Sequence, residues 1–193
     1  MYRFRSIKYL AMTGIITGLL VTIGYCSTFL FGWAITSLFG GNSTLQLFDA
    51  VFIPFCAFFE GPMLLFAGPI AGGIFDLISG VKIVVIPITI FIRILMFFVI
   101  KLLINKSWWS TVYTFFFAAI LLLIYPLSYL VIYPDYAITV NELITDSIQA
   151  IFAYFVAIPL YYPLSKNKIR SNYSFWNDQE FDYLKNKKIT VLE

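Results

Sequence analysis

The chain has 193 residues, of which 61% are apolar and 12% are charged, and its mean hydropathy is +0.88. A water-soluble domain of this size could not cover so much apolar surface, so the composition excludes a soluble protein and indicates a lipid bilayer as the solvent. The formal net charge is only +3, and no nucleic-acid partner is expected.

The length limits how the chain can be organised. A membrane-spanning helix needs about 20 mostly apolar residues, so residues 1–165 can supply several crossings but no soluble catalytic domain. Apolar runs between polar, glycine and proline breaks predict an all-α integral membrane protein, a bundle of six transmembrane helices. The predicted spans are 7–31, 47–60, 62–80, 84–104, 111–133 and 142–164.

Few residues could support catalysis or hold a metal. Histidine is absent, which removes the usual metal ligand and near-neutral proton shuttle. Cys26 and Cys56 fall in apolar segments, as free buried thiols do. A glycine-rich phosphate loop and a Ser/His/Asp set are also absent from the sequence. We therefore expect no enzyme activity, metal or cofactor.

The first span follows a short basic segment that contains Arg3 and Arg5. Its apolar run is longer than the core of a signal peptide, which has about 7–15 residues, so we interpret it as a transmembrane helix. Gly14 and Gly18 form a Gly-x-x-x-Gly step, which lets another helix pack closely. That helix could belong to this chain or to another protein.

Residues 32–46 are predicted to form a long external loop between the first two spans. The loop is partly apolar, which a fully solvated loop would not need, so we expect it to fold back over the bundle as a lid. Trp33 and Phe39 are its candidate contacts with a bound solute.

The second span, 47–60, is too short to cross a bilayer upright, because its residues would extend only about 21 Å as a helix. It is either tilted or a re-entrant segment. The third span is crowded with small residues, including Gly68, Gly72 and Gly73, which we expect to allow close helix packing. Asp76 near its external end is a candidate structural partner for a basic residue.

Arg93 in the fourth span is the principal candidate for function. A guanidinium near the middle of a membrane is costly unless it is paired or faces water. Its partner could be Asp76, in a structural ion pair, or an anionic group of a ligand. The sequence does not decide between them.

Two tyrosines in the fifth span, Tyr125 and Tyr129, could stack on a flat heterocycle, although simple packing explains them equally well. In the sixth span Glu142, Asp146 and Gln149 share one helical face. We assign Glu142 to an ordinary wet helix end and predict that Asp146 and Gln149 contact the solute.

Basic residues indicate the topology, because cytoplasmic flanks are enriched in lysine and arginine. With both termini cytoplasmic, every basic residue except Lys82 and Arg93 lies on the cytoplasmic side of the six spans. Residues 166–193 form a polar tail with interleaved aromatic residues. We expect it to lie on lipid headgroups, and a role in docking a partner is the alternative.

Together these features resemble the substrate-binding S components of energy-coupling-factor (ECF) vitamin transporters. The residues that carry the resemblance are the Gly14/Gly18 step and the Gly68-Pro69-Ile70-Ala71-Gly72-Gly73-Ile74-Phe75-Asp76 segment. The resemblance covers residues 6–165. The chain has glycine where the family typically has alanine in the first helix, and the resemblance gives the tail no role.

The resemblance implies a multi-pass protein of the bacterial plasma membrane that captures a vitamin outside the cell. It would deliver the vitamin through a transmembrane coupling protein and two ATPase subunits, with Gly14 and Gly18 as the docking surface. Arg93 and the aromatic residues favour a riboflavin- or folate-like vitamin over nicotinate or pantothenate. The alternatives are a stand-alone small transporter or channel and, without a visible catalytic constellation, a membrane enzyme of lipid metabolism.

Overall fold

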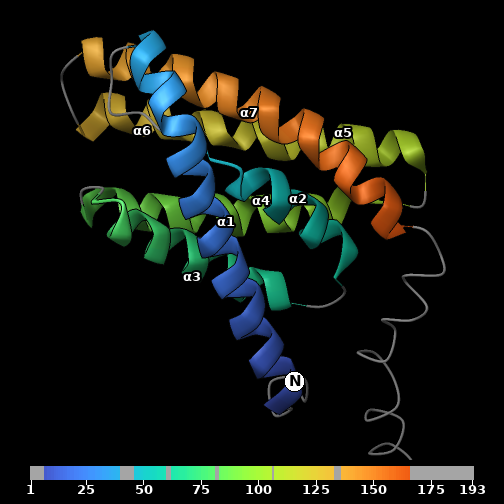
Figure 1. The fold of residues 1–193 in the computed structure, drawn as a ribbon. Helices are drawn as coiled ribbons and strands as arrows, with labels where there is room; N and C mark the ends of the chain where they lie inside the picture. Colours follow the sequence, from blue (N-terminus) through green and yellow to red (C-terminus); the bar gives the residue numbers. More distant parts are fainter. Residues whose placement is uncertain are drawn as a thin grey trace, which may run out of the picture.

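The computed structural model describes residues 7–39, 46–59, 62–80, 83–105, 107–132 and 136–165, without the side chains of 8, 32–39, 129, 132, 137 and 138 (Figure 1). Within these ranges every regular element is helical, as the sequence predicted. The elements are α1 (Ile7–Phe39), α2 (Phe48–Phe58), α3 (Met63–Ile78), η2 (Ile83–Val85), α4 (Ile86–Leu103), α5 (Trp108–Ile120), η3 (Leu121–Leu123), α6 (Ile124–Ile132) and α7 (Tyr136–Ser165).

Four of the described segments are long and apolar enough to cross a membrane. They are Tyr9–Phe31, Ile83–Leu103, Trp108–Ser128 and Thr139–Ser165. Large apolar side chains such as Phe29 and Val131 are also exposed on the outside of the bundle, where lipid would cover them. The chain is therefore an all-helical protein suited to crossing a membrane several times.

The predicted loop over 32–46 is wrong in its first part, because α1 continues to Phe39. Residues 32–39 contain no proline, and the first pair of adjacent glycines is Gly40-Gly41. Trp33 and Phe39 thus lie on a helix, and their expected solute contacts concern side chains outside the described set. The last helix is also longer than predicted, since α7 begins at Tyr136 and includes Glu142 within it.

Helix α2 lies in the middle of the molecule (Figure 1). One side of α2 contacts α7, the other contacts α4, and α1 crosses beside it while packing on α3. The side chains of Phe48 and Phe52 are wholly buried, as are those of Ile53 and Cys56. With 11 residues, α2 is about 16 Å long, which is too short to cross a bilayer alone.

Both ends of α2 are held by other helices. At its start, the backbone N–H of Leu47 donates to Ser27 Oγ of α1 at 2.9 Å, and Ser27 is itself buried. Past its end, the Lys101 ammonium of α4 donates to the carbonyl oxygen of Phe59 at 2.6 Å. A cation is favourable there because the carbonyl end of a helix carries partial negative charge.

Two glycines of α3 allow its close approach to α2 and α4. A Cβ at Gly68 would overlap the ring of Phe52, and a Cβ at Gly72 would lie 2.6 Å from Nε of Arg93. A Cβ at Gly73 would meet only ordinary contacts with Ile86 and Ile90, the nearest at 3.5 Å. Gly72 therefore provides the space that the Arg93 side chain occupies.

We expect Gly72→Ala to destabilise the protein by about 1–3 kcal/mol, because its methyl group would displace the Arg93 side chain. Gly14→Ala is the matched control, since a Cβ at Gly14 would meet nothing within 4 Å and alanine favours a helix. Thermal unfolding of the purified variants in detergent measures the difference. Equal melting temperatures for Gly72→Ala and the wild type would contradict this packing.

Candidate functional site

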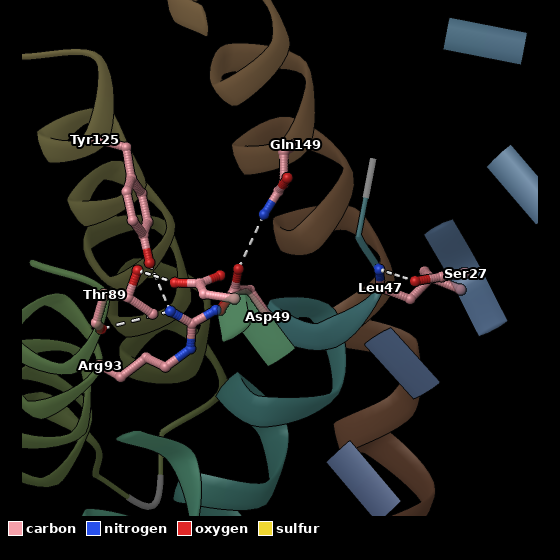
Figure 2. A network of polar contacts seen from close by, with 8 residues as sticks. Ser27, Leu47, Asp49, Thr89, Arg93, Tyr125 and Gln149 are labelled. Atoms are coloured by element: carbon pink, nitrogen blue, oxygen red, sulfur yellow. Dashed lines mark hydrogen bonds and ion pairs between the residues drawn. The ribbon is translucent and has the colours of Figure 1, made fainter. Parts of the chain in front are cut away.

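A buried polar cluster lies where α2, α4, α6 and α7 meet, and Arg93 is at its centre (Figure 2). The Arg93 side chain is only 2% exposed, although it comes from a largely apolar helix. An ionised group inside a membrane protein is stable only with compensating partners and commonly marks a functional site.

Each partner of Arg93 comes from a different part of the fold. Its Nη2 lies 3.6 Å from Oδ1 of Asp49 in α2. Its Nη1 donates to the hydroxyl of Tyr125 in α6 at 2.5 Å and to the carbonyl oxygen of Thr89 in its own helix at 3.4 Å. The guanidinium carbon also lies 4.3 Å from the ring centroid of Phe48, which is a cation–π distance.

Asp49 joins three helices through its carboxylate. It is 0% exposed, and besides the ion pair it accepts a hydrogen bond at Oδ2 from Gln149 Nε2 of α7 at 3.0 Å. Figure 2 shows Asp49 between the side chains of Arg93 and Gln149. Because Ser27 fixes the start of α2, it also fixes the turn that carries Asp49.

Asp76 is attached to the cluster indirectly. Its Oδ2 accepts a hydrogen bond from the Thr89 hydroxyl at 2.5 Å, and the Thr89 carbonyl accepts one from Arg93. Thr89 precedes Arg93 by one helical turn and thus links the two charged groups. From the sequence the partner of Arg93 was left open between Asp76 and a ligand anion. The structure pairs Arg93 with Asp49 instead, because α2 brings that carboxylate to the guanidinium.

The structure brings together four of the residues that the sequence nominated for solute contact or charge compensation. Arg93, Tyr125 and Gln149 belong to the cluster directly, and Asp76 belongs through Thr89. Asp146 is on the same face of α7 as Gln149, one turn nearer the start of the helix. The side chains of Tyr129, Trp33 and Phe39 lie outside the described set.

Gly14 and Gly18 lie on the exposed side of α1. A Cβ added to either glycine would meet nothing within 4 Å. Among the described residues, no helix of this chain packs against the Gly-x-x-x-Gly step.

Sequence reasoning missed Asp49, Thr89 and Phe48. Asp49 is an acidic residue in an apolar segment, which is a signal for function, but its spacing along the chain does not show that it meets Arg93. Thr89 and Phe48 carry no such signal. Their roles depend on which helices meet, and spacing along one helix does not reveal this.

The cluster offers several kinds of polar recognition in a small space. It contains a guanidinium, carboxylates, an amide and a phenol, surrounded by apolar side chains. Such a mixture can hold and orient a small polar solute. Among the described residues, no group of three or more Cys, Asp or Glu side chains is placed to hold a metal ion.

Comparison of the chain with protein-family models, curated proteins and solved structures finds no match. Its function is therefore argued from its own residues and contacts, together with the resemblance of its sequence pattern. The described residues contain two features that bear on function. One is the buried polar cluster around Arg93, and the other is the exposed face of α1 at Gly14 and Gly18.

We expect Asp49→Leu and Arg93→Met each to destabilise the protein by about 3–5 kcal/mol, because each leaves the other charge buried without its ion-pair partner. The double variant should recover most of that loss, since it removes both charges. Gln149→Leu, which removes one hydrogen bond to Asp49, should cost about 1–3 kcal/mol.

Thermal unfolding of the wild type, the two single variants and the double variant gives the coupling free energy between Asp49 and Arg93. Additive effects of Asp49→Leu and Arg93→Met would show that these residues do not form the principal pair. Asp76→Leu combined with Arg93→Met provides the comparison, and we expect weaker coupling there because Thr89 lies between the two groups.

Proposed function

We propose that this chain is the vitamin-binding S component of an ECF-type importer, which captures a small B-vitamin-like molecule outside the cell. It delivers the molecule through a transmembrane coupling protein and two ATPase subunits. The observation that carries the proposal is the buried cluster of Arg93, Asp49, Tyr125 and Gln149 between four helices of an apolar bundle. Polar groups at this depth are costly, and a solute-binding role accounts for keeping them.

The proposal includes six membrane spans with both termini in the cytoplasm. Lys101 bonds to Phe59, so the end of α2 and the end of α4 lie on one side of the bundle. The rings of Trp108 and Tyr162 are 6.1 Å apart, which adds the start of α5 and the end of α7 to that side. Lys101 lies on this side, and cytoplasmic flanks are enriched in lysine and arginine, which agrees with this orientation.

The exposed face of α1 supports a docking role for Gly14 and Gly18. Small side chains allow the backbone of a second helix to come close, and this chain provides no such helix among its described residues. A coupling protein that supplies the second helix would explain why a step suited to packing is left open.

The identity of the vitamin is a separate question. A riboflavin- or folate-like compound was favoured from the sequence because Arg93 could meet an acidic group. The ion pair between Arg93 and Asp49 weakens that argument, since the guanidinium already has an anionic partner. A flat heterocycle remains suitable because Tyr125 and Phe48 place aromatic rings at the cluster.

We expect the purified full-length protein to bind one compound of a tritiated panel of riboflavin, folate, nicotinate, pantothenate and thiamine. Gln149→Leu should weaken that binding by about tenfold, because a buried amide is lost. Phe155→Leu, an exposed site on the same helix, is the matched control and should bind normally. Failure of the wild type to bind any vitamin would overturn the proposed function.

We expect Gly14→Leu combined with Gly18→Leu to abolish vitamin uptake by cells while leaving binding to the purified protein unchanged. The added bulk blocks helix approach but lies far from the buried cluster. Cys26, which was predicted to be buried, is exposed on α1, so Cys26→Leu adds bulk at another exposed position of this helix and should leave uptake intact.

Uptake that persists in the double glycine variant would contradict the docking role. Uptake by the wild-type chain alone in vesicles, without ATPase subunits and driven by an ion gradient, would instead identify a stand-alone transporter.

A further inference from the structure

We propose that the solute recognised by this site carries a positive charge, and that Asp146 binds that charge. The inference rests on the proposed solute-binding function and narrows its substrate class. It replaces the acidic solute that Arg93 alone would favour. The observations behind it are a buried carboxylate oxygen of Asp146 that has no hydrogen bond among the described residues and the acidic groups beside it.

One carboxylate oxygen of Asp146 accepts no hydrogen bond from the described residues. Its Oδ2 is buried and has no hydrogen-bond partner among the described residues. The hydroxyl groups on either side of it in the sequence, those of Thr145 and Ser147, donate to carbonyl oxygens of their own helix at 3.0 and 2.6 Å. Each hydroxyl has one proton, so neither can donate to Asp146 as well.

The charged groups that act on Asp146 are themselves acidic. They are Glu142, one turn earlier on α7, and Asp49 of α2. Arg93 does not compensate for this, because it is ion-paired with Asp49 and also interacts with Asp76. Among the described residues, the two charges that act on Asp146 are therefore both negative.

Asp49 of α2 also has a carboxylate oxygen without a hydrogen bond among the described residues. It is wholly buried, and its Oδ1 has the 3.6 Å ion pair with Arg93 but no hydrogen bond. Asp49 and Asp146 thus each have one buried carboxylate oxygen without a hydrogen bond among the described residues. Buried polar atoms are normally satisfied, and exceptions commonly mark a place for an ion or ligand.

The position of Asp146 connects this unmet charge to the proposed solute site. Asp146 and Gln149 are three residues apart on one face of α7, and Gln149 contacts Asp49 directly. A cation beside Asp146 would therefore touch the edge of the Arg93 cluster. Tyr125, whose hydroxyl accepts from Arg93, and Phe48, whose ring lies 4.3 Å from the guanidinium carbon, add aromatic side chains to this cluster.

The test compares vitamins of different charge on the purified full-length protein in potassium buffer. Thiamine has a permanently charged thiazolium ring and serves as the cationic probe, beside neutral riboflavin and anionic folate and pantothenate. We expect thiamine to bind most tightly. Asp146→Asn should weaken its binding by about 30-fold or more, because a buried charge pair loses one partner.

A merely structural role for Asp146 would give a different pattern. Because Asp146→Asn removes an unsatisfied charge, the unliganded variant should melt at the same temperature as the wild type or higher. Asp146→Glu retains the charge and should keep more affinity for thiamine than Asp146→Asn. Asp178→Asn removes one acidic residue from the polar tail and should bind thiamine as the wild type does.

Each other outcome overturns the inference in a recognisable way. Preferential binding of folate or riboflavin would leave the vitamin-binding function standing but exclude a cationic solute. Stabilisation by sodium ions alone, lost in Asp146→Asn, would make this a site for an inorganic cation. Thiamine affinity that is unchanged in Asp146→Asn would remove Asp146 from recognition, and binding of no vitamin would overturn the proposed function itself.

Discussion

The burial of one guanidinium constrains the whole arrangement of helices. Removing an arginine from water costs several kcal/mol even after relaxation, so its environment must supply an anion, acceptors and space together. Here the anion comes from α2, the phenol from α6 and the space from a glycine of α3. An α2 helix packed elsewhere would leave Arg93 without its carboxylate, so the position of this short helix and the charge of Arg93 depend on each other.

The helical class and most of the helix positions could be predicted, because they follow from local apolar runs. The role of Gly72 in close packing was also accessible, since small residues at helical spacing have few other uses in a membrane. Asp49 was not found, because nothing local shows which carboxylate a buried arginine will meet. Asp76 was the carboxylate considered, and the packing of α2 against both α4 and α7 brings Asp49 to the guanidinium instead.

The position where α1 ends was the second error, because a loop was predicted from residue 32. Residues 32–39 have no strong helix breaker, and α1 therefore runs well past Ser27, where the chain later returns to begin α2. A search for apolar runs ends a span when its hydropathy falls. The fall in hydropathy marks the end of the apolar run and does not mark the end of the helix. The end of the helix must be inferred from breakers such as Gly40-Gly41.

The hydrogen bond between Ser27 and Leu47 gives α1 a mechanical connection to the interior. Ser27 lies on the inner side of α1, while Gly14 and Gly18 lie on its outer side several turns away. One continuous helix therefore carries both the contact with α2 and the exposed glycine face. A tilt of α1 displaces Ser27, and the bond transmits that displacement to the backbone one residue before Phe48 and two before Asp49. A contact made on the outside of α1 can thus strain the ion pair at the centre of the bundle without touching it.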